Sequence, residues 1–110
     1  IMDRTQQYRE IILHLLNDYA SVKSPFWPDV ENQIVSDVGE DHYQLLRLGW
    51  DEHGIFVYAV AFHLALKDGK VLIYANNTDR NIADELSAAG IAREDIVLAF
   101  LERRVAGQAA

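Results

Sequence analysis

The sequence predicts an α+β fold, in which an N-terminal helix and a second helix cover a mostly antiparallel sheet. Three observations predict it. A period-two pattern from Ile55 to about Lys67 is typical of a long strand. Asp68-Gly69, which follows directly, is a strong signal for a tight hairpin turn. Helical periodicity marks the N-terminal segment and a segment that ends near Ala89. We therefore expect a meander of about four strands plus a short C-terminal strand.

The composition narrows the class of protein. The chain has 110 residues, of which 50% are hydrophobic and 25% charged, so we expect one packed domain over residues 1–110. Lys and Arg number 10 against 17 Asp and Glu, which gives a net charge of −7. An acidic domain is a poor candidate for gripping duplex DNA alone, because such binding draws on cationic contacts to phosphates. The absence of cysteine excludes disulfides and thiolate metal sites.

The sequence also bears on the compartment. No apolar run approaches the roughly 20 residues that span a bilayer, and no basic region followed by an apolar one marks a signal peptide. We therefore expect a cytoplasmic protein without membrane contact. The acidic excess has two readings: an ordinary solvated surface, or a face that docks on a basic partner.

The N-terminal helix is expected from Asp3 to about Ser21. Apolar residues recur there at spacings of four and three, as on one face of a helix, and Asp3 favours the positive end of the helix dipole. His14 lies off this stripe and is expected to face solvent. The stripe itself comprises Tyr8, Ile12, Leu15, Tyr19 and Val22.

A proline-flanked loop follows, because each proline of Ser24–Pro28 removes a backbone donor and disfavours helix in the residue before it. Phe26 and Trp27 in this loop either fold back onto the core or form a recognition surface. The next segment, Val30–Asp37, is mixed in polarity and is expected to be a half-exposed strand.

The centre of the chain is a long hairpin. Its arms are Asp41–Trp50 and Ile55–Lys67, the turn is 51–54, and Asp68-Gly69 leads into a further strand, Lys70–Ala75. Alternation along the second arm predicts that its bulkier side chains share one face of the sheet. These side chains are Phe56, Tyr58, Val60, Phe62, Leu64 and Leu66.

The C-terminal part begins with a polar loop, in which Thr78 or Asp79 can cap a second helix that runs to about Ala89. Gly90 is expected to end that helix in a left-handed conformation. Ile96–Phe100 is too short for an independent helix and is expected to be a buried strand. The tail, Leu101–Ala110, ends in small residues and is expected to fray.

Among possible chemical groups, two histidines are of interest. Counting outward from the turn at 51–54 places His42 opposite about His63, unless a bulge shifts the pairing. Facing histidines can bind a metal or share a proton, although strand histidines are also common as plain surface residues. Asp51 and Glu52, like other turn carboxylates, more often hold the turn than act as acids or bases. No motif predicts a catalytic residue, a metal site or a cofactor.

Several phrases of the chain resemble the XisI family, which is described as controlling excision of the fdxN DNA element in cyanobacteria. The resemblance runs from about Met2 to Phe100, and the order and spacing of the phrases carry it. They are Tyr8–Ile12, Asp41–Leu45, Gly49-Trp50, His63, Lys67–Val71, Ile82–Leu86, Gly90-Ile91 and Glu94–Phe100.

The resemblance implies a small accessory protein that acts with a nuclease-like companion, XisH, and with a site-specific recombinase that performs the DNA chemistry. It supplies no catalytic residues. The chain departs from the family at Ala65, where an acidic residue is frequent, and at Leu72, where tryptophan is frequent. It also differs over Tyr74–Asp79 and over the closing segment from Leu101.

Three functions are therefore open. The first is a non-enzymatic controlling factor that binds a XisH-like partner, for which Phe26, Trp27, Asp51 and Glu52 are the expected contacts. The second is a metal- or ligand-binding protein, or an enzyme, that uses His42 and His63. The third is a scaffold that self-associates through a sheet edge or the Phe26-Trp27 loop.

Overall fold

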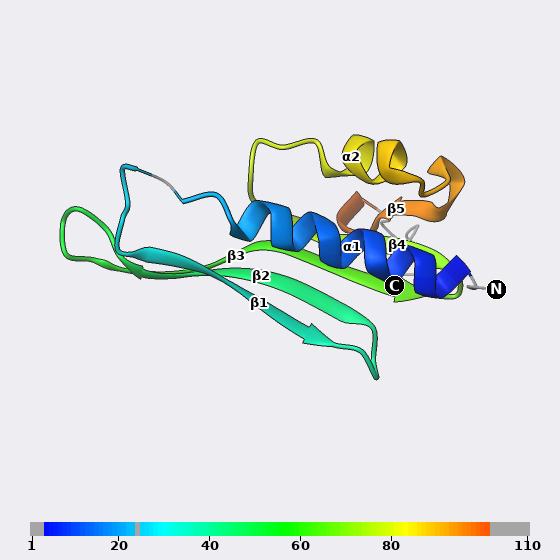
Figure 1. Cartoon of the computed structure of the whole chain (residues 1–110), viewed down its shortest axis with the longest axis horizontal. Helices are drawn as coiled ribbons and strands as arrows, with labels where there is room; N and C mark the ends of the chain where they lie inside the picture. Colours follow the sequence, from blue (N-terminus) through cyan, green and yellow to red (C-terminus); the bar gives the residue numbers. More distant parts are fainter. Residues whose placement is uncertain (1–3, 24, 102–110) are drawn as a thin grey trace, which may run out of the picture.

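The computed structural model describes residues 4–23 and 25–101, which form two α-helices on one side of a five-stranded sheet (Figure 1). This confirms the α+β class. Within the described part, neither helix is long and apolar enough to cross a membrane. The elements are α1 (Arg4–Ala20), β1 (Val30–Asp37), β2 (His42–Trp50), β3 (Phe56–Lys67), β4 (Lys70–Asn76), α2 (Ile82–Ala89), η1 (Arg93–Asp95), β5 (Ile96–Leu98) and η2 (Ala99–Leu101).

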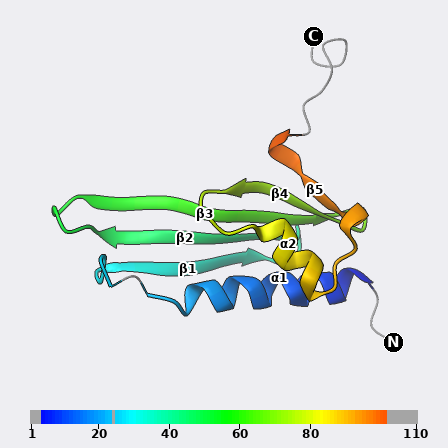
Figure 2. The same ribbon diagram turned by 90° about the horizontal axis from the view of Figure 1, so that it is seen from above.

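The sheet is a meander with one added strand. Strands β1 to β4 pair antiparallel with their sequence neighbours, and β5 pairs parallel with β4, so the spatial order is β1-β2-β3-β4-β5. The parallel pair needs a crossover, which α2 provides. Figure 1 shows α1 and α2 on the same side, and Figure 2 shows the strands side by side, with α2 over them and α1 along the β1 edge. We call the side away from the helices the outer face.

Helix α1 ends at Ala20, close to the predicted end at Ser21. Tyr8, Ile12, Leu15 and Leu16 are buried against the sheet, and His14 is exposed as expected. The predicted stripe extends too far, however. Val22 lies beyond the last helical turn and is 64% exposed. Asp3, which was expected to favour the positive end of the helix dipole, lies outside the described residues.

Helix α2 is capped by a different residue from the two that were predicted. The side chain of Asn81 accepts a hydrogen bond from the backbone N–H of Asp84 at 3.1 Å. Thr78 instead accepts from the backbone N–H of Arg80 at 3.2 Å and so stabilises the preceding loop. Gly90 ends the helix with a φ of 123°, which an L side chain rarely adopts.

A bulge divides β3 into two halves that face opposite sides of the sheet. Leu45 pairs with Phe62, but the next residue, Leu46, pairs with Val60, so Ala61 is an extra residue in β3. The prediction that all bulky residues of this strand share a face is therefore wrong. Phe62, Leu64 and Leu66 are buried beneath the helices, whereas Phe56, Tyr58 and Val60 lie on the outer face.

The ends of β3 and of the chain match the predictions only in part. Asp68 and Gly69 have φ values of 53° and 76°, as the predicted two-residue turn requires. The C-terminal strand is shorter than predicted: β5 stops at Leu98, and Phe100 in η2 is 56% exposed instead of buried. Of the tail, only Leu101 belongs to the described residues.

A buried carboxylate joins α1 to the C-terminal part. Asp95 is 6% exposed and accepts a hydrogen bond from the Tyr8 hydroxyl at 2.7 Å. Arg4 lies 3.2 Å and Lys70 3.8 Å from the same carboxylate. The Tyr8 hydrogen bond, aided by the two cations, holds the pKa of Asp95 below its ordinary value. The stabilisation that this carboxylate contributes is therefore lost only when the solution becomes strongly acidic.

Gly49 allows the backbone just before β1 to approach β2 closely. Its φ is 147°, and an added Cβ would lie 2.0 Å from the backbone oxygen of Asp29. The same oxygen accepts a hydrogen bond from the backbone N–H of Trp50 at 3.2 Å. A side chain at position 49 would have to push this loop away from the sheet.

We predict that Gly49→Ala lowers the free energy of unfolding by about 3 kcal/mol, because it combines backbone strain with a steric clash. Urea denaturation measures this. Gly54→Ala is the matched control, since Gly54 also has a positive φ, 74°, but nothing within 4 Å of an added Cβ. The control is expected to cost only about 1 kcal/mol. Equal losses of unfolding free energy in the two variants would contradict the role of the close approach between Gly49 and Asp29.

Candidate functional site

The structure brings His42 and His63 together on the outer face. The Nδ1 atom of His42 lies 3.0 Å from the Nε2 atom of His63. Counting from the turn predicts that the two residues are directly opposite, and this is wrong. His42 pairs with Ala65, and His63 pairs with Gln44. The register differs by one residue at the turn and by one more at Ala61. Because the sum is two, both rings stay on the same face and meet diagonally.

Two neighbouring side chains complete this cluster. The side-chain nitrogen of Gln44 lies 3.3 Å from Nδ1 of His63. The ring of Tyr74 is stacked on His42, with centroids 6.0 Å apart, and lies 5.1 Å from the ring of His63. A second bulge places Tyr74 here, because the pairing of β3 with β4 skips from Ile73 to Ala75.

The 3.0 Å contact restricts the charge on the two rings. One ring must donate an N–H and the other must accept it, so the contact is incompatible with two imidazolium ions. Burial lowers the pKa of His63 below its ordinary 6.5, and repulsion from His42 lowers it further. His63 is therefore neutral at neutral pH. Asp37 is the cross-strand partner of His42 on the other side, in β1.

The predicted contacts at the hairpin turn differ in role. Asp51 accepts hydrogen bonds from the backbone N–H groups of Ile55, at 3.0 Å, and His53, at 2.8 Å. The bond from Ile55 and then that from His53 keep its pKa below the ordinary value. Asp51 thus holds the turn, which was the structural alternative for this residue. Glu52 is exposed, with His53 at 3.5 Å.

The two aromatic residues of the proline-flanked loop also differ in exposure. Phe26 is 81% exposed, whereas Trp27 is half-buried and lines a cleft on the helix side. In both views this loop lies at the same end of the molecule as the β2–β3 turn (Figures 1 and 2). The four predicted partner contacts therefore share one end of the molecule, and their role stays a prediction.

Sequence reasoning missed the cleft that Trp27 lines. Its volume is about 340 Å³, and two arginines reach it from distant segments, Arg47 from β2 and Arg80 from the loop before α2. Both guanidinium groups lie over the ring of Tyr19, at 5.7 Å and 5.1 Å from its centroid. Neither arginine belongs to a recognisable motif, so only the topology shows that they converge.

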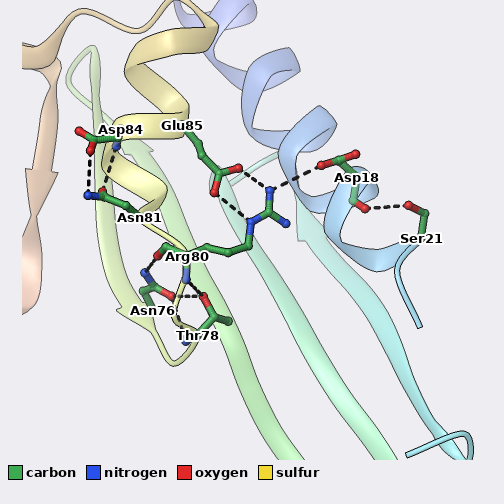
Figure 3. A network of polar contacts seen from close by, with 8 residues as sticks. All are labelled: Asp18, Ser21, Asn76, Thr78, Arg80, Asn81, Asp84 and Glu85. Atoms are coloured by element: carbon green, nitrogen blue, oxygen red, sulfur yellow. Dashed lines mark hydrogen bonds and ion pairs between the residues drawn. The ribbon is translucent and has the colours of Figure 1, made fainter. Parts of the chain in front are cut away.

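Arg80 links the two helices through carboxylates. Figure 3 shows its guanidinium group between Glu85 of α2 and Asp18 of α1. Its Nε donates to Glu85 at 2.9 Å, and its Nη2 also contacts Glu85 and lies 3.5 Å from Asp18. The hydrogen bond to Glu85 is the main reason why the pKa of Arg80 lies above its ordinary value.

The loop before α2 fixes the backbone of Arg80. The side chain of Asn76 donates to the carbonyl oxygen of Arg80 at 2.8 Å and accepts from the Thr78 hydroxyl at 2.7 Å (Figure 3). At the far end of the loop, the amide of Asn81 donates to Asp84 at 2.8 Å. These bonds explain the run of polar residues that follows β4.

We predict that replacing His42 by Asn raises the pKa of His63, because it removes one of the two causes of the depression. Imidazole chemical shifts in an NMR titration measure this. The protein is expected to lose stability as the pH falls through about 6.5, since the unfolded chain then binds the proton more readily. His14→Asn should leave the His63 titration unchanged. An unaltered titration in His42→Asn would contradict the contact between the rings.

Comparisons with known proteins agree with this fold. The family described as XisI protein matches residues 2–108. The chain resembles a XisI-like protein from Anabaena variabilis ATCC 29413, with 41% identity and a TM-score of 0.75, over 86% of this chain and 84% of that one. It also resembles the fdxN element excision controlling factor XisI from the same organism, with 31% identity and a TM-score of 0.73. That match covers 89% of this chain and 93% of the other. None of the curated proteins matches. The chain belongs to the XisI family.

Proposed function

We propose that this XisI-family protein is a non-enzymatic controlling factor that acts by binding a XisH-like companion through its outer face. The observation that carries the proposal is the apolar surface that no described element covers. Four aromatic residues and one valine on this face are between 41% and 69% exposed. They form what we call the outer patch: Val35, Trp50, Phe56, Tyr58 and Tyr74.

The outer patch has the composition of an interface. Its four aromatic side chains alone expose roughly 320–540 Å², taking about 150–250 Å² for each whole side chain. Leu46, Leu48 and Val60 lie on the same face and are partly exposed. Together these residues approach the roughly 800 Å² that each partner buries in a complex of standard size. Aromatic residues are also enriched in interfaces relative to other surfaces.

Charge favours a basic partner. The middle of the outer face has no charged side chain apart from any protonated histidine, whereas Glu31 and Asp37 lie along its β1 edge and Glu52 at its end. The outer face thus has an apolar centre, with carboxylates along its β1 edge and at the turn and Lys67 at the opposite end; on a protein of net charge −7 it suits a protein that itself binds nucleic acid. The link to DNA and to a recombinase is then indirect.

The proposal is tested by co-expressing the chain with the XisH-like protein encoded beside it and measuring the mass of the mixture by size exclusion with light scattering. A defined complex is expected. Tyr58→Glu, which places a charge on a side chain that is 69% exposed, should abolish it without affecting folding. Phe26→Glu examines the predicted loop contact in the same way.

Phe100→Glu is the matched control, because Phe100 is an exposed aromatic residue in η2, away from the outer patch. It should leave the complex intact. Separate elution at micromolar concentrations would overturn the proposal, as would tight binding of duplex DNA by the chain alone at physiological salt. A homo-oligomer that Tyr58→Glu dissociates would assign the patch to self-association instead.

The contact between His42 and His63 favours a second candidate function, the binding of a divalent transition metal. Metal–nitrogen distances of about 2.0–2.1 Å and the 3.0 Å separation give an angle of roughly 91–97° at the metal. Adjacent positions of a square-planar or octahedral ion have this angle, which points to copper or nickel. No third His, Asp or Glu joins them among the described residues, so water would complete the shell.

Calorimetric titration with nickel at pH 7.5 tests this second candidate. One ion per chain is expected, and His63→Ala should weaken binding at least about tenfold, because a single histidine remains. His53→Ala is the control, since His53 is exposed on the β2–β3 turn. Equal affinity in the two variants, or no binding by the unaltered chain, would rule out the site.

A further inference from the structure

The cleft on the helix side contains a cation, Arg47, with which no carboxylate of the described residues pairs. Arg47 is half-buried, and no carboxylate among the described residues lies within ion-pair distance of it. Its Nη2 donates to the hydroxyl of Tyr19, and its guanidinium group lies over the same ring. Arg80, in contrast, has Glu85 and Asp18. A half-buried charge that lacks an opposite charge is costly, so Arg47 is the group in this cleft that an anion would stabilise most.

A second donor faces the same space. The Tyr19 hydroxyl accepts from Arg47, and its own proton has no acceptor within the part of the chain that the structure describes. Asn32, also on the wall of the cleft, directs its amide nitrogen to the carbonyl oxygen of Val22 at 3.2 Å. An anionic oxygen beside both groups would receive one hydrogen bond from the Tyr19 hydroxyl and a charge-assisted one from a further N–H of Arg47.

The remaining wall is apolar. Trp27 and the side chains of Val22 and Val30 line it. The volume of about 340 Å³ lies at the lower end of the range for small-molecule sites. Such a site fits a compact ligand with one negative group and one planar or apolar part. A long peptide would not fit, because the cleft is small.

We infer that this cleft binds a small organic anion, whose carboxylate or phosphate lies against Arg47 and Tyr19 and whose apolar part lies against Trp27. The site is on the helix side of the sheet, so it is separate from the outer patch and does not depend on the proposed partner. Its ligand also differs in chemistry from a metal ion at the histidine pair.

Trp27 provides the measurement. The chain has two tryptophans, and Trp50 is on the outer face, so Trp50→Phe leaves Trp27 as the fluorescent reporter. Benzoate and adenosine monophosphate are the probes, titrated to about 10 mM in low-chloride buffer. At least one is expected to change the fluorescence saturably, with a Kd between roughly 1 μM and 1 mM. The two arms distinguish a carboxylate ligand from a phosphate ligand.

Substitutions test the named contacts in the same background. Arg47→Gln should weaken binding of the tighter-binding probe by about ten- to a hundredfold, because it removes a charge-assisted hydrogen bond. Tyr19→Phe keeps the ring and should weaken binding of the same probe by about two- to tenfold. Arg93→Gln is the matched control, since Arg93 is exposed and pairs with Asp84 at 2.7 Å elsewhere on the surface. It should leave the Kd unchanged.

Three results would overturn the inference. The first is the absence of a saturable change with either probe. The second is equal binding of the uncharged counterparts, benzyl alcohol and adenosine. The third is an unchanged Kd in both Arg47→Gln and Tyr19→Phe. Circular dichroism and thermal melting of each variant separate loss of the site from loss of the fold, and the Tyr19→Phe variant keeps the test valid if Arg47→Gln does not fold.

Discussion

The arrangement of the whole molecule depends on one extra residue in β3. Ala61 has no partner in β2, and its insertion reverses the direction in which the following side chains point. The half of β3 that lies beneath the helices supplies Phe62, Leu64 and Leu66 to the core. The other half supplies Phe56 and Tyr58 to the outer face. Without the bulge, these apolar residues would all compete for one side of the sheet.

The same insertion separates two chemically different surfaces. On the outer face, Tyr74 and Gln44 lie beside His42 and His63, and Trp50, Phe56 and Tyr58 lie nearer the β2–β3 turn. On the helix side, Arg47 and Arg80 converge over Tyr19 in a protein whose overall charge is −7. Among the described residues, Arg80 pairs with Glu85 and Asp18, whereas no carboxylate pairs with Arg47. Each surface therefore suits a different kind of ligand.

The sequence predicts most of the elements because their signals are local. The period of α1, the Asp68-Gly69 turn and the end of α2 at Gly90 all follow from neighbouring residues. The bulge at Ala61 leaves no such signal, since alternation continues on both sides of it. It changes the register of the histidines, although a compensating residue at the turn keeps them together. Arg47 and Arg80 meet only through packing, which periodicity does not encode.

The bond between Tyr8 and Asp95 has a consequence for synthesis of the protein. The two residues are 87 positions apart, so the carboxylate leaves the ribosome long after the phenol. Strands β1 to β4 pair with sequence neighbours and can form while translation continues. Tyr8 gains its carboxylate partner only when η1 has emerged, whereas Arg9 of the same helix already pairs with Asp41. We therefore expect a nascent chain stalled before Asp95 to hold its meander with α1 packed on it, while the Tyr8 hydroxyl still lacks its buried carboxylate.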